Sequence, residues 1–66
     1  MKVRTAKDIL KNESIPYWKI AKEMNVSENT VWRMLRDNEE NLSCENEEKL
    51  FKAINAINIE RHTGND

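Results

Sequence analysis

The chain has 66 residues, a net charge of −1 and only one glycine and one proline. This length excludes a cleft between two lobes, and the small number of turn residues favours one all-helical domain over a sandwich or barrel. Its single cysteine, Cys44, excludes an intrachain disulfide, and with His62 alone it cannot complete a zinc site, so we expect no metal, no cofactor and a reducing, cytoplasmic location. No apolar run approaches the length of a membrane span or a signal-peptide core, so no membrane association is expected.

The first predicted element is a helix of two to three turns near the start of the chain. Apolar residues recur there at helical spacing, namely Val3, Ala6, Ile9 and Leu10. The polar residues that follow predict an end between Asn12 and Ser14. Ser14 is a plausible cap for the next helix, and Pro16 suits the first turn of that helix, where its missing N–H costs nothing.

A second helix is predicted from about Tyr17 to Asn25. Its inward face consists of Ile20, Ala21 and Met24. Asn25 marks the end, because a helix that stops abruptly often needs one left-handed residue, a conformation that Gly and Asn tolerate best. Val26 is apolar and able to fill the corner. Ser27 is then a strong N-cap for a third helix, and Glu28 in its first turn favours the helix dipole.

The third predicted helix runs to about Arg36. Its buried face consists of Val31, Met34 and Leu35. Residues 37–42 are polar and have no apolar periodicity, which predicts a loop.

A last helix is predicted over about residues 44–59, with Ser43 or Cys44 as its cap. Its inward stripe consists of Leu50, Ala53, Ile54 and Ile57. The tail 61–66 is polar and is expected to fray. Residues 1–66 therefore form one domain.

The run from Tyr17 to Arg36 reads YWKIAKEMNVSENTVWRMLR, and it resembles the helix-turn-helix of phage repressor and Cro proteins and of the lac-repressor family headpiece. Ala21 matches the position where the two helices cross and only a small residue fits, and Asn25 matches the turn position that is usually glycine. The internal apolar positions of the motif match Val26, Val31 and Met34. The pattern VSxxTVxR, residues 26–33, is particularly similar to the lac-repressor type.

The resemblance covers residues 17–59. Leu42-Ser43 and the run EKL at residues 48–50 match the start of the next helix in the lac-repressor family, after a loop about one residue longer here. The chain departs from that family in having an additional helix before the motif, as repressor and Cro domains do, and nothing after the headpiece to bind an effector. The resemblance implies a small four- to five-helix domain of the lambda-repressor-like helix-turn-helix type that binds double-stranded DNA and needs no small-molecule effector.

In such a motif the second helix lies in the major groove with its N-terminal residues at base edges. The resembling families read bases with the residues matching Glu28, Asn29 and Arg33. The chemistry of these side chains agrees, because Asn can bond bidentately to adenine, Arg to guanine, and Glu can accept from cytosine. Glu28 has an alternative role, as a helix-dipole residue that repels phosphate. Contacts to phosphates or sugars, which fix register without reading sequence, are expected from Trp18, Lys19, Ser27, Thr30 and Arg36.

Trp32 is the undecided member of the base-reading group. It either packs on a sugar or a thymine methyl, or leans back onto the Trp18 side of the domain. Phe51 and Ile59 fall beside the inward stripe of the last helix. They are candidate contacts of a homodimer, which would bind two half-sites one helical turn apart, or they only cover the edge of the core.

Charge is distributed unevenly along the chain. Residues 1–36 carry eight basic and four acidic side chains, a net charge of +4, and residues 37–66 carry three basic and eight acidic, a net charge of −5. The basic half could face phosphates. The acidic run of the second half is either a solvated face or a docking surface for a basic partner, and consists of Glu39, Glu40, Glu45, Glu47 and Glu48.

These patterns favour a sequence-specific DNA-binding transcriptional regulator, a small phage or mobile-element protein of the repressor or Cro type. The alternative is a protein-binding adaptor or anti-repressor that uses the same fold and its acidic half. An enzyme is not expected, because Cys44 and His62 have no neighbours in the sequence that form a nucleophile, metal or carboxylate-pair constellation.

Overall fold

The computed structural model describes residues 1–63, and these residues form four helices. The helices are α1 (Val3–Asn12), α2 (Tyr17–Met24), α3 (Glu28–Met34) and α4 (Cys44–Thr63). The described part of the chain is all-α, as predicted from the sequence. Across residues 1–63, no helix is both long and apolar enough to cross a membrane.

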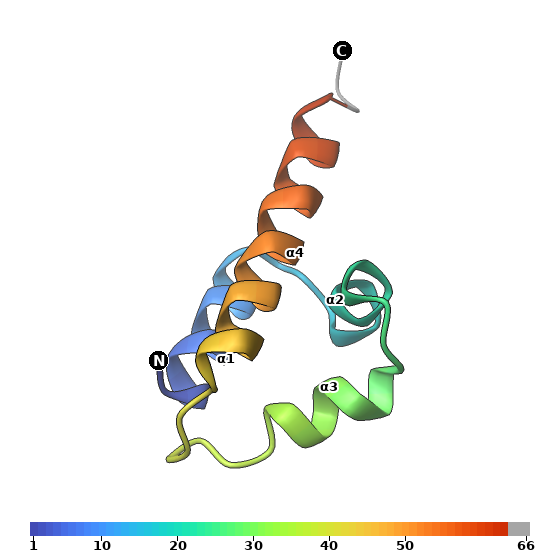
Figure 1. Cartoon of the computed structure of the whole chain (residues 1–66). Helices are drawn as coiled ribbons and strands as arrows, with labels where there is room; N and C mark the ends of the chain where they lie inside the picture. The colour runs from blue at the N-terminus through green and yellow to red at the C-terminus, as the bar shows by residue number, and fades with distance from the viewer. Residues whose placement is uncertain (64–66) are drawn as a thin grey trace.

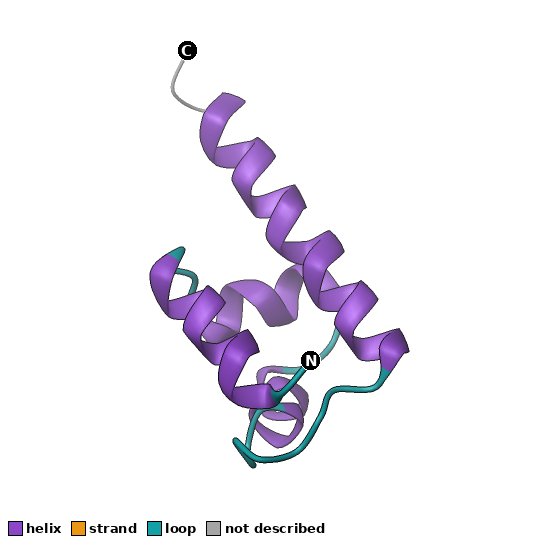
Figure 2. Cartoon of the chain, turned by 90° about the vertical axis from the view of Figure 1, so that its left-hand side faces the viewer, coloured by secondary structure: helices purple, strands orange, loops and turns teal. Residues whose placement is uncertain are grey.

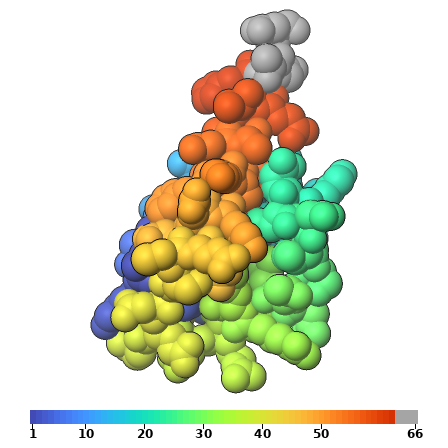
Figure 3. Space-filling model, viewed as in Figure 1, coloured from blue at the N-terminus to red at the C-terminus, as the bar shows by residue number. Residues whose placement is uncertain are grey.

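α2 is the central element, because it packs against both α3 and α4. α3 lies at one end of the molecule, and the last turns of α4 project from the other end (Figure 1). In the view turned by 90°, α1 and α4 stand on two sides of the molecule with α2 behind them and α3 seen end-on at the bottom (Figure 2). The space-filling surface narrows towards the end of α4 (Figure 3), consistent with principal extents of 40 × 21 × 18 Å.

The core is formed by one apolar stripe from each helix. Its buried helical residues are Val3, Ala6, Leu10, Ile20, Ala21, Val31, Leu50, Ala53, Ile54 and Ile57, with Leu35 just after α3. These confirm the predicted stripes, although the predicted members Ile9, Met24 and Met34 are only half-buried at the edge. Burying a side chain such as Ile20 or Val31 contributes about 1.5–3 kcal/mol, so burial fixes which faces of α2 and α3 point outward.

Two further core residues come from the connections between helices. Ile15 is buried from the turn between α1 and α2, and Leu42 from the loop before α4. The periodicity of the sequence did not assign either residue to the core, because neither belongs to a helical stripe. Their burial anchors the two connections to the helices.

The corner between α1 and α2 differs from the prediction for Ser14. Its backbone is left-handed, with φ 55°, and Ile15 N donates to Leu10 O at 2.9 Å across it. Ser14 thus closes the end of α1 instead of capping α2, and the predicted N-cap role was wrong. Pro16 occupies the N-cap position of α2, where its missing N–H costs nothing.

The corner between α2 and α3 is a tight three-residue turn. Asn25 is left-handed, with φ 59° and ψ 43°, and Val26 N donates to Ala21 O at 3.0 Å. The Ser27 side chain caps α3 by accepting from Thr30 N at 3.2 Å. Both predictions, for Asn25 and Ser27, are confirmed. Val26 covers the corner but stays 38% exposed, so it does not fill it.

The loop after α3 is fastened to the start of the chain. Val3 N donates to Glu40 O at 2.8 Å, Leu42 N donates to Met1 O at 2.8 Å, and Lys2 forms an isolated antiparallel bridge with Asn41. We call this pairing the N-terminal clasp. The loop was predicted, but its pairing with residues nearly forty positions earlier was not. It carries the chain from the end of α3 to the start of α4.

α4 begins as predicted and ends later than predicted. Ser43 caps it, since Asn46 N donates to the Ser43 hydroxyl at 3.2 Å. The helix continues beyond the expected end at residue 59 as far as Thr63. Arg61 stabilises this extension by donating to Glu13 O at 2.5 Å and to Ser14 O at 3.0 Å. The rest of the predicted frayed tail, residues 64–66, lies outside the described residues.

Candidate nucleic-acid interface

The outer face of α3 displays the four side chains that the sequence assigned to base reading. Val31 and Leu35 are buried on the inner side of this segment, which turns the intervening residues outward. The exposed residues of this face are Glu28, Asn29, Trp32 and Arg33. Residues four apart are neighbours on a helix, so Glu28 lies beside Trp32 and Asn29 beside Arg33. Donors and acceptors therefore form a compact group on one short helix.

The corner before α3 fixes how this face is presented. The left-handed backbone of Asn25 reverses the chain within three residues, and the Ser27 cap starts α3 immediately afterwards. The Ser27 and Thr30 hydroxyls also hydrogen-bond to each other at 2.9 Å. Both side chains are exposed, so the hydroxyl pair lies on the surface at the N-terminal end of α3.

The remaining residues assigned to phosphate or sugar contacts flank α3. Trp18 is 56% exposed and Lys19 half-buried in the first turn of α2, and Arg36 is exposed just after α3. A ring contact between Tyr17 and Trp32 shows that the first turn of α2 lies against the middle of α3. The structure therefore brings the first turn of α2 next to the outer face of α3, so residues that the sequence assigned to the two kinds of contact lie on neighbouring elements.

Trp32 packs against Tyr17 in an edge-to-face arrangement. The two ring centroids are 4.6 Å apart and the ring planes meet at 65°, a geometry that aromatic pairs favour. The indole nevertheless stays 57% exposed, so it is available for a contact outside the chain. Partial burial raises the pKa of the Tyr17 phenol above its ordinary value, so the phenol is uncharged at neutral pH. Sequence reasoning missed Tyr17, whose partner lies fifteen residues further along the chain.

The basic half of the chain is partly neutralised by the acidic half. Lys2 Nζ lies 3.3 Å from Glu39 Oε2, and Arg4 forms an ion pair with the other oxygen of Glu39. Arg33 and Arg36, in contrast, form no ion pair with another described residue. Lys7, Lys11, Lys19 and Lys22 likewise form no ion pair with another described residue, so the positive charge available to an external anion is spread over α1, α2 and α3.

The acidic run of the second half is also largely paired. Besides Glu39, three of its glutamates form ion pairs: Glu47 with the N-terminal ammonium at 3.5 Å, Glu45 with Lys49 at 3.2 Å, and Glu48 with Lys52 at 3.3 Å. The last two pairs join successive turns of α4 and are exposed, so each contributes little to stability.

No family model, curated protein or solved structure matches this chain. The interface is therefore defined by the chain's own geometry and chemistry.

Phe51 and Ile59, the candidates for a dimer contact, lie on α4 and apart from the outer face of α3. Phe51 is 37% exposed and Ile59 67% exposed. Their exposure leaves apolar surface on the helix that projects from the domain (Figure 1).

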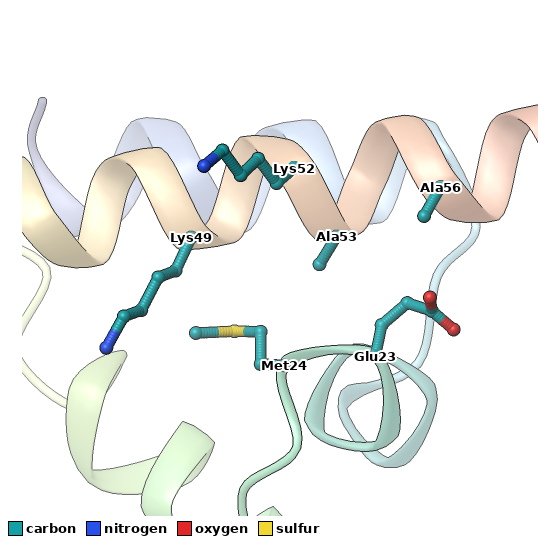
Figure 4. A pocket seen from close by; sticks show the side chains of 6 residues that line it. All are labelled: Glu23, Met24, Lys49, Lys52, Ala53 and Ala56. Carbon is teal, nitrogen blue, oxygen red and sulfur yellow. The ribbon is translucent and has the colours of Figure 1, made fainter.

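A shallow groove of about 250 Å³ lies between the C-terminal end of α2 and the middle of α4 (Figure 4). Met24, Ala53 and Ala56 supply its apolar surface, and Glu23 and a pair of α4 lysines supply its charges. None of the residues assigned to DNA contact lines it.

Within residues 1–63, no group of three or more His, Cys, Asp or Glu side chains could hold a metal ion.

Proposed function

We propose that the chain is a sequence-specific DNA-binding transcriptional regulator. In this proposal α2 and α3 form a helix-turn-helix of the lambda-repressor-like type, and α3 enters the major groove. The observation that carries the proposal is the outer face of α3, where Asn29 and Arg33 are exposed side by side behind a tight left-handed turn. In this proposal the domain acts as a phage or mobile-element repressor of the Cro type, by occupying an operator that polymerase or another repressor needs.

Base reading follows from the side-chain chemistry of α3. Asn29 can form two hydrogen bonds to adenine, Arg33 can form two to guanine, and Glu28 can accept one from cytosine. Trp32, held at one edge by Tyr17, presents the rest of its indole to a sugar or a thymine methyl. The residues that fix the register on the backbone are Trp18, Lys19, Ser27, Thr30 and Arg36.

Binding as a homodimer completes the proposal. A single α3 touches few base pairs, and two copies on half-sites one helical turn apart double the contacts. Phe51 and Ile59 are the apolar residues on α4 that two copies would bury between them. A palindrome in the selected binding sequence, with half-sites at that spacing, is the expected sign of this arrangement.

The test begins with selection of random duplexes by the purified chain, followed by affinity measurements on the selected sequence. Arg33→Ala is expected to cost about 1–3 kcal/mol, roughly a 5- to 150-fold loss of affinity, and to relax specificity at one base pair. Lys52→Ala is the matched control, because it removes the same charge from an exposed position on α4. Equal affinities for Arg33→Ala and the control would contradict the assigned orientation of α3.

A protein-binding adaptor or anti-repressor remains the alternative from another class, motivated by the acidic second half. Four of its glutamates form ion pairs inside the chain, so their number does not require a basic partner. The two functions separate by mutation. An adaptor loses activity with Glu47→Lys or Glu48→Lys and keeps it with Arg33→Ala, and a DNA-binding regulator shows the reverse.

A further inference from the structure

Glu39 accepts from two cationic side chains at once, more than any other carboxylate in the ion pairs between described residues. One carboxylate oxygen receives Lys2 Nζ at 3.3 Å and the other receives the Arg4 guanidinium. All three side chains are more than half exposed, so the cluster is open to solvent. Nearby, Lys7 Nζ donates to Asn38 Oδ1 at 2.9 Å. Residues 38 and 39 thus satisfy three cationic side chains of the first eight residues.

The backbone of the N-terminal clasp brings these cations together. Val3 is buried between Lys2 and Arg4, which leaves the two cationic side chains on the outside. Hydrogen bonds from Val3 N to Glu40 O and from Arg4 N to Asn38 O, the latter at 3.3 Å, place the loop residues on either side of Glu39 against them. The convergence of two cations on one anion position is therefore set by backbone pairing, not by chance contact of long side chains.

The cluster lies on the side of the molecule that the proposed function turns towards DNA. Glu39 is three residues beyond Arg36, in the loop that leads from α3 to α4 at the same end of the molecule as α3 (Figure 1). The backbone of this loop pairs with the start of α1. When a helix lies in the major groove, residues at and beyond its ends face the phosphate backbones that border the groove. A carboxylate at this position would repel those phosphates.

We infer that Lys2 and Arg4 form a phosphate-binding site for the DNA backbone and that Glu39 occupies this site in the free protein. This inference rests on the proposed function. Carboxylate and phosphodiester oxygens accept the same hydrogen bonds from a guanidinium, so one can replace the other. Exposed ion pairs are weak, so displacing Glu39 costs little. On binding, a backbone phosphate takes the place of Glu39, and the carboxylate turns to solvent.

Because Glu39 competes with the phosphate, it lowers the affinity of the chain for DNA. Glu39→Gln is expected to bind the selected duplex about three- to ten-fold more tightly than wild type, because the phosphate no longer competes with a carboxylate. Glu48→Gln is the matched control, since it removes the same charge from an exposed ion pair on α4. Equal gains from both variants would reflect net charge alone and would overturn the inference.

Salt dependence tests the cations themselves. The double variant Lys2→Gln, Arg4→Gln should flatten the slope of log affinity against log salt by about 1.8, the value for two lost phosphate contacts. Adding Glu39→Gln to the double variant should then raise the affinity no more than Glu48→Gln does, because no cations remain for the carboxylate to occupy. Wild type and Glu39→Gln should have the same salt slope, because the phosphate displaces Glu39 in the wild-type complex. A salt slope about 1.8 steeper in Glu39→Gln would show that Lys2 and Arg4 contact phosphates only when the carboxylate is absent. That result would also overturn the inference.

Two controls keep the result interpretable. Thermal unfolding followed by circular dichroism shows whether each variant is folded at the temperature of the binding measurement. If Glu39→Gln is unfolded at that temperature, the salt slope of the Lys2→Gln, Arg4→Gln double variant tests the phosphate site instead. If the wild-type chain selects no duplex, the proposed function and this inference fail together. If Arg33→Ala weakens binding but Glu39→Gln behaves like Glu48→Gln, only this inference fails.

Discussion

Two left-handed residues, Ser14 and Asn25, form the corners on either side of α2. Their φ values are 55° and 59°, in the region that a side chain with a Cβ disfavours by roughly 1–2 kcal/mol. Asn tolerates this region because its short polar side chain can bond locally, and Ser lacks that advantage. The conformational cost is therefore concentrated at the first corner.

Replacing Ser14 by glycine is expected to stabilise the domain. Ser14→Gly removes the Cβ at a positive φ and should raise the free energy of unfolding by about 0.5–1 kcal/mol after the entropy lost by glycine. Urea unfolding followed by circular dichroism measures the change. Ser43→Gly is the control, because Ser43 caps α4 with its hydroxyl and should lose a few tenths of a kcal/mol. A loss of stability in Ser14→Gly would contradict this account of the corner.

The same two residues show what sequence can and cannot predict at this scale. Asn25 was predicted correctly because Asn tolerates the left-handed region and stands directly after the apolar stripe of α2, at the expected helix end. Ser14 was misassigned because Ser is more common as an N-cap, and Pro16 nearby strengthened that interpretation. Only the hydrogen bond from Ile15 N to Leu10 O decides between the two roles.

At the scale of elements, the helix that departs most from prediction is α4. Its polar last turn has no apolar periodicity, so the sequence indicated an end near residue 59. The turn is stabilised instead by Arg61, which donates to the carbonyls of Glu13 and Ser14 at the end of α1. These acceptors lie 47 and 48 residues earlier in the chain, and no local pattern could reveal them.

Removing the Arg61 side chain should release this end of α4. Arg61→Ala is expected to lower the free energy of unfolding by about 1 kcal/mol, since two charge-assisted hydrogen bonds at a partly exposed site are lost. Amide hydrogen exchange should accelerate in the last turn of α4 and at the corner around Ser14. His62→Ala, at an exposed neighbouring position, should leave exchange at that corner unchanged. Equal protection in both variants would show that Arg61 does not join the two elements.

The outward face of α3 was predictable from the sequence, although the helix ends at Met34 and not near Arg36 as predicted. Its inner residues Val31 and Leu35 follow helical spacing, so the outward position of Asn29 and Arg33 could be inferred without a structure. What could not be inferred are its neighbours. Tyr17 contacts Trp32 from another helix. The ion pairs of Glu39 with Lys2 and Arg4 depend on the pairing of the loop with the first residues of the chain.

At the scale of the molecule, the N-terminal clasp and the core make the described chain one unit. The clasp joins the first residues to the loop after α3, and α2 packs against both α3 and α4. It also makes the charge separation between the two halves smaller at the surface than in the sequence, because Glu39 forms ion pairs with Lys2 and Arg4 across the boundary. The parts have no separate cores in which to fold.

Unfolding is therefore expected to be a single cooperative transition. The two tryptophans, Trp18 and Trp32, report on α2 and α3, and far-UV circular dichroism reports on all four helices, with the largest share from α4. Fluorescence and circular dichroism should give the same midpoint and the same slope in urea. Lys2→Gln, which removes an exposed ion pair beside the clasp, should shift both midpoints by the same small amount. Two separated midpoints would mean that α4 and the α2–α3 pair unfold independently.

The projecting end of α4 is a suitable place for a fluorescent label that reports the orientation of the protein on DNA. A helix of 20 residues is about 30 Å long, and α4 starts beside the clasp and ends on the side away from α3. A fluorophore attached at His62 is thus carried by a stiff rod, remote from the surface proposed to meet the duplex. Its anisotropy would follow tumbling of the whole particle, and energy transfer from labelled duplex ends would reveal the angle at which the rod stands.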